Sequence, residues 1–116
     1  MIHYMKLNPN AFHQMTRGEK TIELRLNDEK RQAINTDDII EFSNILNPNE
    51  ALRVEIIKIH NFANFTELYK SLPLNKCGYS SEQLHIASPK DMEEYYSIPE
   101  QNKYGVLGIE VELTNM

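Results

Sequence analysis

The chain has 116 residues, of which 41% are hydrophobic and 25% charged, and its formal net charge is −5. This composition predicts a single folded domain over residues 1–116 and excludes a disordered chain. The acidic balance also excludes a protein that coats long nucleic acids through bulk positive charge, although a local basic cleft for one nucleotide or a short strand stays compatible with it.

The chain shows no signal for export or membrane insertion. No apolar run approaches the ~20 residues that cross a bilayer, and the N-terminus lacks the apolar block of a signal peptide. The single cysteine, Cys77, excludes an intramolecular disulfide. We therefore expect a cytoplasmic protein that does not associate with membranes.

The N-terminal part predicts a strand, a helix and a second strand. Residues 4–7 suit a strand, and Asn8 and Pro9 supply the N-cap and first position of a helix that Gly18 ends. From Thr21 the period changes to two. The two faces of the second strand then comprise Ile22, Leu24 and Leu26 on the apolar side, and Thr21, Glu23 and Arg25 on the polar side.

The rest of the chain predicts further strands and a helical excursion. We expect a charged surface turn at 27–32, a tight turn at 35–38, a strand at 39–42, a loop at 44–49, a long strand at 52–60 and a final strand at 104–113. In the long strand, one face should comprise Leu52, Val54, Ile56 and Lys58. Capping-box patterns predict helices that begin near Asn64, Ser80 and Ser88. The short, non-alternating strands favour an α+β fold: a small, mostly antiparallel barrel with flanking helices.

The most informative stretch is 18–25, Gly-Glu-Lys-Thr-Ile-Glu-Leu-Arg. Residues two apart on a strand project to the same side about 7 Å apart, so Glu23 and Arg25 can act on one ligand, with Lys20 just before the strand. Lys20 could hold a phosphate, Glu23 serve as a general base and Arg25 anchor a phosphate or base edge. The alternative is an exposed strand face with weak ion pairs.

The aromatic residues and possible metal ligands give weaker signals. Tyr95, Tyr96 and Tyr104 are candidates for stacking on a base, against the ordinary alternative of half-buried core tyrosines. The histidines lack the close spacing of a metal site, so we expect no metal. No glycine-rich phosphate loop or nucleophile elbow occurs either, and we expect no cofactor.

The stretch 18–25 resembles the Gly-x-Lys-x-x-Glu-x-Arg signature of the ASCH domain, a family of the PUA-like superfamily. The preceding helix, the segment 37–42 and Tyr104-Gly105 at the final strand support this resemblance. It implies a PUA-like β-barrel whose cleft binds RNA, a nucleotide or a modified nucleoside, with Thr21, Tyr95 and Tyr104 joining Lys20, Glu23 and Arg25 as ligand-binding residues.

The resemblance also suggests chemistry. Some small bacterial members are amidohydrolases that deacetylate N4-acetylcytidine with a lysine, a threonine and a glutamate, and ribonuclease activity has been attributed to a member. Lys20 matches the catalytic lysine, whereas Glu23 occupies the position of the catalytic threonine, so a hydrolase would use Glu23 to activate water. Candidates for the catalytic glutamate are Glu67, Glu82, Glu93 and Glu94. A third hypothesis is a protein-interaction module without a small ligand.

Overall fold

A computed structural model describes residues 1–114. Along the chain, its elements are β1 (Ile2–Leu7), α1 (Pro9–Thr16), β2 (Ile22–Leu26), α2 (Glu29–Gln32), β3 (Ile39–Asn44), β4 (Asn47–Phe62), α3 (Phe65–Ser71), the 3₁₀ turns η1 (Leu74–Lys76), η2 (Leu84–Ile86) and η3 (Pro89–Glu94), α4 (Ile98–Tyr104) and β5 (Val106–Leu113). None of the helices in this part of the chain is both long and apolar enough to cross a membrane.

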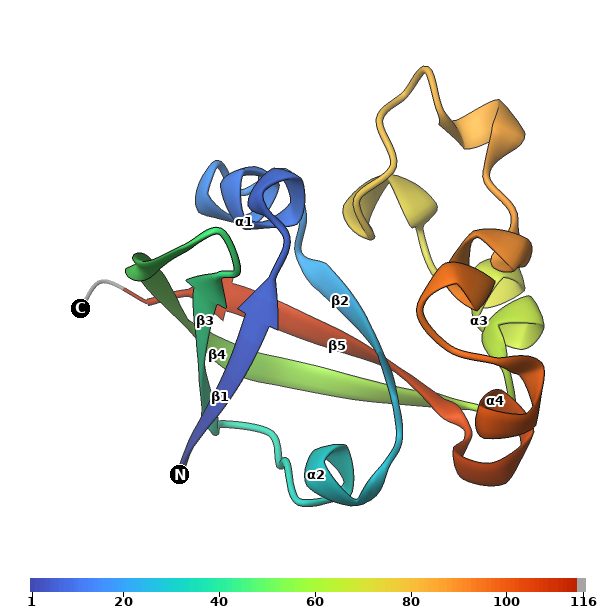
Figure 1. Cartoon of the computed structure of the whole chain (residues 1–116), viewed down its shortest axis with the longest axis horizontal. Coiled ribbons are helices and arrows are strands. Elements are labelled where there is room, and N and C mark those ends of the chain that lie inside the picture. The colour runs from blue at the N-terminus through green and yellow to red at the C-terminus, as the bar shows by residue number, and fades with distance from the viewer. Residues whose placement is uncertain (115–116) are drawn as a thin grey trace.

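Within residues 1–114, five strands form one sheet in the order β1-β3-β4-β5-β2. The β1–β3 pair is parallel and the other three pairs are antiparallel, which confirms the mostly antiparallel α+β fold. The sheet curls into a half-barrel whose edge strands, β1 and β2, come near one another (Figure 1). The half-barrel thus has an open seam between two described strands that share no backbone ladder.

Two apolar clusters hold the fold together. One packs α1 against the sheet around Met15, Phe42 and Ile56, which are at most 1% exposed. The other packs α3 and its neighbours against β2 and β5 around Phe65 and Leu68, both fully buried. All three apolar residues of the edge strand β2 belong to the second cluster, so that cluster fixes which way the polar face of β2 points.

The predicted N-terminal elements are confirmed. The Asn8 side chain accepts a hydrogen bond of 2.9 Å from the Ala11 backbone N–H, and Pro9 begins α1. Gly18 has φ of 76°, the left-handed conformation that glycine adopts without a steric penalty, and it turns the chain into β2. As predicted, Ile22, Leu24 and Leu26 enter the second apolar cluster.

The prediction for 44–49 is wrong, because β3 and β4 form a tight hairpin. Pairing extends to Asn44 opposite Asn47, and Pro48 lies inside β4 near the end of the hairpin. The predicted faces of β4 also need a correction. The register shifts between Ile56 and Lys58, so Ile59, and not Lys58, continues the buried face. A β-bulge inserts one residue and exchanges the faces beyond it, which an alternating pattern does not reveal.

The C-terminal predictions are partly correct. Residues 73–97, which we call the excursion, contain three 3₁₀ turns and no α-helix. Ser80 begins a hydrogen-bonded turn and Ser88 caps η3, but both turns are too short for the predicted α-helices. Residues 98–104 form the helix α4. The final strand, predicted at 104–113, therefore begins only at Val106, and Tyr104 belongs to the helix. The missed signal was a complete capping box at Ser97 and Glu100.

Candidate functional site

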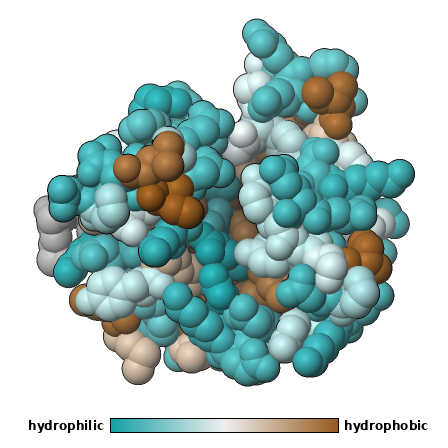
Figure 2. Space-filling view, in the orientation of Figure 1, coloured by the Kyte–Doolittle hydropathy of each residue, from teal (hydrophilic) through white to brown (hydrophobic). Residues whose placement is uncertain are grey.

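A cavity of about 610 Å³ lies between α1, β2 and the excursion. Figure 2 shows a hollow between the surface over α1 and the surface over the excursion, bordered largely by hydrophilic side chains. Helix α1 contributes Ala11 and Gln14, and the excursion contributes its tyrosines. This volume falls within the range of small-molecule binding sites.

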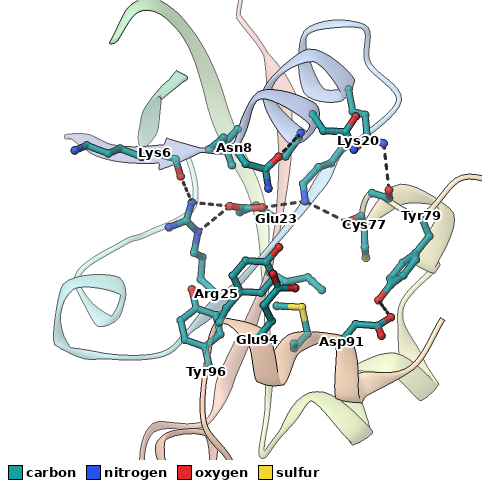
Figure 3. Close-up of a pocket in the computed structure, with 18 of the residues that line it drawn as sticks. Lys6, Asn8, Lys20, Glu23, Arg25, Cys77, Tyr79, Asp91, Glu94 and Tyr96 are labelled. Atoms are coloured by element: carbon teal, nitrogen blue, oxygen red, sulfur yellow. Dashed lines mark hydrogen bonds and ion pairs between the residues drawn. The ribbon is translucent and has the colours of Figure 1, made fainter. Parts of the chain in front are cut away.

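The innermost wall of the cavity is an ion cluster built by Lys20, Glu23 and Arg25. The Lys20 Nζ atom lies 3.0 Å from Glu23 Oε1, and Arg25 Nε donates to Glu23 Oε2 at 2.7 Å. Glu23 is only 5% exposed and Lys20 only 8%. Figure 3 shows the carboxylate between the two cations. The cluster therefore carries one net positive charge in a largely desolvated place.

The two cations set the protonation state of Glu23. Burial alone would raise the Glu23 pKa, but the charges and hydrogen bonds of Lys20 and Arg25 outweigh it and hold that pKa below its ordinary value. The carboxylate also holds the Arg25 pKa above its ordinary value, against the effect of burial. Glu23 is thus an ionised anchor whose two oxygens are both engaged, and a weak base.

Backbone groups of η1 and its surroundings fix Lys20. The Lys20 Nζ atom donates to the Cys77 carbonyl oxygen at 3.1 Å, and the Thr21 N–H donates to the Lys76 carbonyl at 2.9 Å. Gly78 follows with φ of 114°, and a side chain there would begin 3.5 Å from Lys20 Nζ. The cavity wall near the ammonium group is consequently backbone, which leaves room for a ligand.

Four tyrosines also line the cavity: Tyr69, Tyr79, Tyr95 and Tyr96. The hydroxyls of Tyr69 and Tyr79 lie 2.7 Å apart, and Tyr79 also donates to Asp91 Oδ2 at 2.7 Å. Burial raises the Tyr69 pKa to about 12 and raises the Tyr79 pKa as well, so both stay protonated. This chain of hydrogen bonds ties the excursion to α3.

The structure brings together four of the six predicted ligand-binding residues. Lys20, Glu23, Arg25 and Tyr95 line the cavity, whereas Thr21 and Tyr104 do not. Thr21 makes backbone hydrogen bonds beside the cluster, including one of 2.9 Å that its carbonyl oxygen accepts from the Val111 N–H. Tyr104 ends α4 and packs into the second apolar cluster.

Among the four candidate glutamates, Glu94 lines the cavity and the other three lie outside it. Figure 3 shows Glu94 on η3 beside the cavity. The sequence prediction did not single out Tyr79 or Asp91, because their contact spans 12 residues of irregular chain. Only the capping box of η3 marked Asp91 at all.

Cys77 lies at the cavity wall as a buried thiol. Burial raises its pKa to about 11, although the charge of Lys20 acts in the opposite direction. A thiol with that pKa is a poor nucleophile near neutral pH. Within residues 1–114, no group of three or more His, Cys, Asp or Glu side chains is arranged to hold a metal ion.

Comparison with known proteins now identifies the class. The fold of this chain matches solved structures over almost its whole length. The crystal structure of the hypothetical protein PH0355 has a TM-score of 0.80 at 29% identity and covers 98% of this chain and all of its own. The solution structure of protein PF0455 from Pyrococcus furiosus has a TM-score of 0.72 at 28% identity, with full coverage of both chains.

A third structure carries the family name. The crystal structure of ASCH from Zymomonas mobilis has a TM-score of 0.67 at 12% identity and covers 96% of this chain and 66% of its own, which is a likeness of fold alone. The family model of the ASCH domain matches residues 5–115. The chain therefore belongs to the ASCH domain family, which is generally thought to bind RNA or nucleotides. A search of the curated proteins found no match.

Proposed function

We propose that the cavity binds one nucleoside unit, either as a free nucleotide or modified nucleoside or as an unstacked base of RNA. The observation that carries this proposal is the buried cluster of Lys20, Glu23 and Arg25 in the wall of a cavity of about 610 Å³ that four tyrosines also line. Ammonium and guanidinium donors suit the carbonyl and ring-nitrogen acceptors of a base, and aromatic rings suit its faces.

The charge balance of the lining supports a polar ligand without a long phosphate chain inside the cavity. Three cations, Lys6, Lys20 and Arg25, are matched by three carboxylates. The carboxylates are Glu23, Asp91 and Glu94. A di- or triphosphate placed within this lining would meet as many negative as positive groups, whereas a base and a ribose meet donors and acceptors of both kinds.

Calorimetric titration with a panel of common and modified nucleosides tests the proposal. We expect saturable binding that E23Q weakens at least about tenfold, because a neutral amide in place of the carboxylate would leave both cations without their counter-charge. The matched control is E19Q, since Glu19 also pairs with an arginine, Arg17, but on the exposed surface outside the cavity. Equal affinity of both variants, or no binding by the wild type, would contradict the proposal.

Hydrolysis of an acylated nucleoside is the second candidate function, and the position of Glu94 favours it. Glu23 is a weak base with both oxygens engaged, so a water-activating role falls to Glu94, whose carboxylate lies on the same cavity as the Lys20 ammonium. Incubation with N4-acetylcytidine should then release cytidine and acetate. E94Q should abolish the release, and E93Q, which lies outside the lining, should retain it.

A further inference from the structure

A second concave surface adjoins the cavity at the seam between the edge strands. This groove has a volume of about 430 Å³, and its polar lining comprises Lys6, Arg25, Lys30, Arg31, Glu41 and Ser43. Lys6 and Arg25 line the cavity as well as the groove. The two concavities therefore share a wall at the Arg25 guanidinium.

The groove is positive in a protein whose formal net charge is −5. Of its four basic residues, Arg31 pairs with Asp28 at 3.0 Å, and the one acidic residue of the lining, Glu41, pairs with Arg53 at 3.0 Å. With the cluster around Glu23 included, the region holds six cations, Lys6, Lys20, Arg25, Lys30, Arg31 and Arg53. Three carboxylates, Glu23, Asp28 and Glu41, leave an excess of three positive charges.

The cations of the groove retain donors that the protein does not use. The Arg31 Nε atom is buried and has no hydrogen-bond partner within residues 1–114. The Lys6 ammonium group makes no hydrogen bond or ion pair with any residue that the structure describes. Lys30 donates to the Tyr4 carbonyl at 2.7 Å, which uses one of its three protons.

The cations also repel one another. Burial is the largest of the effects that lower the Lys30 pKa. The charges of Arg31, Arg25 and Lys6 lower this pKa further, whereas the charge of Asp28 raises it. An anion between these groups would relieve that repulsion and accept hydrogen bonds from the Lys6 and Lys30 ammonium groups. The groove thus has the charge, the donors and the room for a tetrahedral oxyanion.

We propose that this groove is a phosphate subsite, in which Lys6, Lys30 and Arg31 hold a phosphate that is covalently continuous with the nucleoside in the cavity. The inference rests on the proposed nucleoside site and extends it. Because Arg25 lines both concavities, a base in the cavity and a phosphate in the groove would lie on the two sides of one guanidinium, joined through the ribose of the same nucleotide. The phosphate is either the terminal monoester of a free nucleotide or a phosphodiester of an RNA strand.

Four kinds of probe test the subsite by calorimetric titration at low salt: each common ribonucleoside, its 5′-monophosphate, the matching homotetranucleotide RNA, and inorganic phosphate. We expect at least one phosphate-bearing nucleotide probe to bind about tenfold tighter than its nucleoside, with the advantage shrinking as NaCl is added. Tighter binding of the monophosphate identifies a free nucleotide as the ligand. Tighter binding of the tetranucleotide identifies an RNA strand.

Three variants separate the subsite from the cavity. K30A should lower the affinity for the phosphate-bearing probes about tenfold and leave the nucleoside affinity unchanged, because Lys30 lines the groove and not the cavity. K6A should weaken the phosphate-bearing probes about tenfold more than the nucleoside, because Lys6 lines both concavities. K58A, an exposed strand lysine outside both concavities, should change neither affinity. The Lys6 ammonium group holds no partner among the described residues, so K6A decides the outcome if K30A fails to fold.

The possible failures are distinguishable. If nucleosides bind but the phosphate-bearing probes bind no tighter, or if K6A weakens both equally, the subsite is disproved and the nucleoside site stands. If no nucleoside binds, while inorganic phosphate binds in a manner that K6A abolishes, the nucleoside proposal fails and the anion site stands alone. If no probe binds, both are disproved.

Discussion

The Arg25 Nη2 atom donates a hydrogen bond of 2.6 Å to the carbonyl oxygen of Lys6 and so links the two edge strands of the half-barrel. The same guanidinium contacts Glu23 at 2.7 Å through Nε. The Lys30 ammonium repeats the arrangement at the Tyr4 carbonyl. Side chains from β2 and α2 thus satisfy the exposed acceptors of β1 where a closed barrel would use backbone N–H groups.

R25K tests whether this link needs the planar guanidinium. A lysine keeps the charge but lacks the fork that reaches Glu23 and the Lys6 carbonyl together, so we expect a loss of about 2 kcal/mol in the free energy of unfolding. Chemical denaturation measures it. The matched control is R53K in the more exposed Arg53–Glu41 pair, for which we expect a change within about 1 kcal/mol. Equal losses in both variants would refute a special role for the seam.

E23Q tests the stability of the buried ion cluster. We expect a loss of about 3 kcal/mol in the free energy of unfolding at pH 7, since Lys20 and Arg25 remain buried without their counter-charge. E19Q alters an exposed pair and should leave stability nearly unchanged. A stability of E23Q equal to that of the wild type would show that the cluster is not held as described.

The depressed pKa of Glu23 predicts the direction of the pH dependence. A carboxyl whose folded-state pKa lies below its unfolded value stabilises the fold above the unfolded pKa of about 4.3, and the contribution is lost as pH falls through the folded-state pKa. The stability difference between wild type and E23Q should therefore be constant from pH 7 to about 5 and shrink below about 4. Denaturation series at several pH values measure this. A constant difference down to the lowest pH at which both fold would contradict the assignment.

Cys77 should react slowly with alkylating reagents. With its pKa raised to about 11, we expect little thiolate near neutral pH and a rate of iodoacetamide labelling that rises steadily from pH 7 to 10. Mass spectrometry follows the labelling, and the denatured protein serves as the reference with an ordinary thiol. Rapid labelling of the folded protein at pH 7 would instead indicate an activated nucleophile.

The hydrogen bonds among Tyr69, Tyr79 and Asp91 should keep the excursion ordered. Y79F removes the hydrogen bond to Asp91 and the one to Tyr69, so we expect faster amide hydrogen exchange in the excursion, with the sheet unchanged. Y104F is the control, because Tyr104 lies outside the cavity. Exchange in the excursion that is the same in both variants would show that the hydroxyl contacts do not hold this wall.

The sequence predicted the elements whose signals are local. The cap at Asn8, the end of α1 at Gly18 and the alternation through β2 depend on neighbouring residues, and each lies where expected. The bulge near Ile57 and the hairpin at 45–46 escaped prediction because cross-strand pairing determines them. The irregular excursion escaped for the same reason, since tertiary contacts hold its turns.

The site residues that could be predicted from the sequence are likewise those whose signals are local. Lys20, Glu23 and Arg25 were found together because one strand and the turn before it present them. Tyr79 and Asp91 were missed, and Tyr104 was placed on a strand when it ends a helix, because those positions depend on the path of the excursion. The burial of Glu23 was also unexpected, since the polar face of an edge strand ordinarily faces water.

The central claim is that the cavity beside Glu23 holds a nucleoside unit, and a crystal structure of the wild-type protein with the best-binding nucleoside of the panel tests it most directly. We predict electron density for the base between the Lys20–Glu23–Arg25 cluster and the tyrosines of the excursion, within hydrogen-bonding distance of Lys20 or Arg25. Density for the nucleoside elsewhere on the protein, with this cavity filled only by water, would contradict the account.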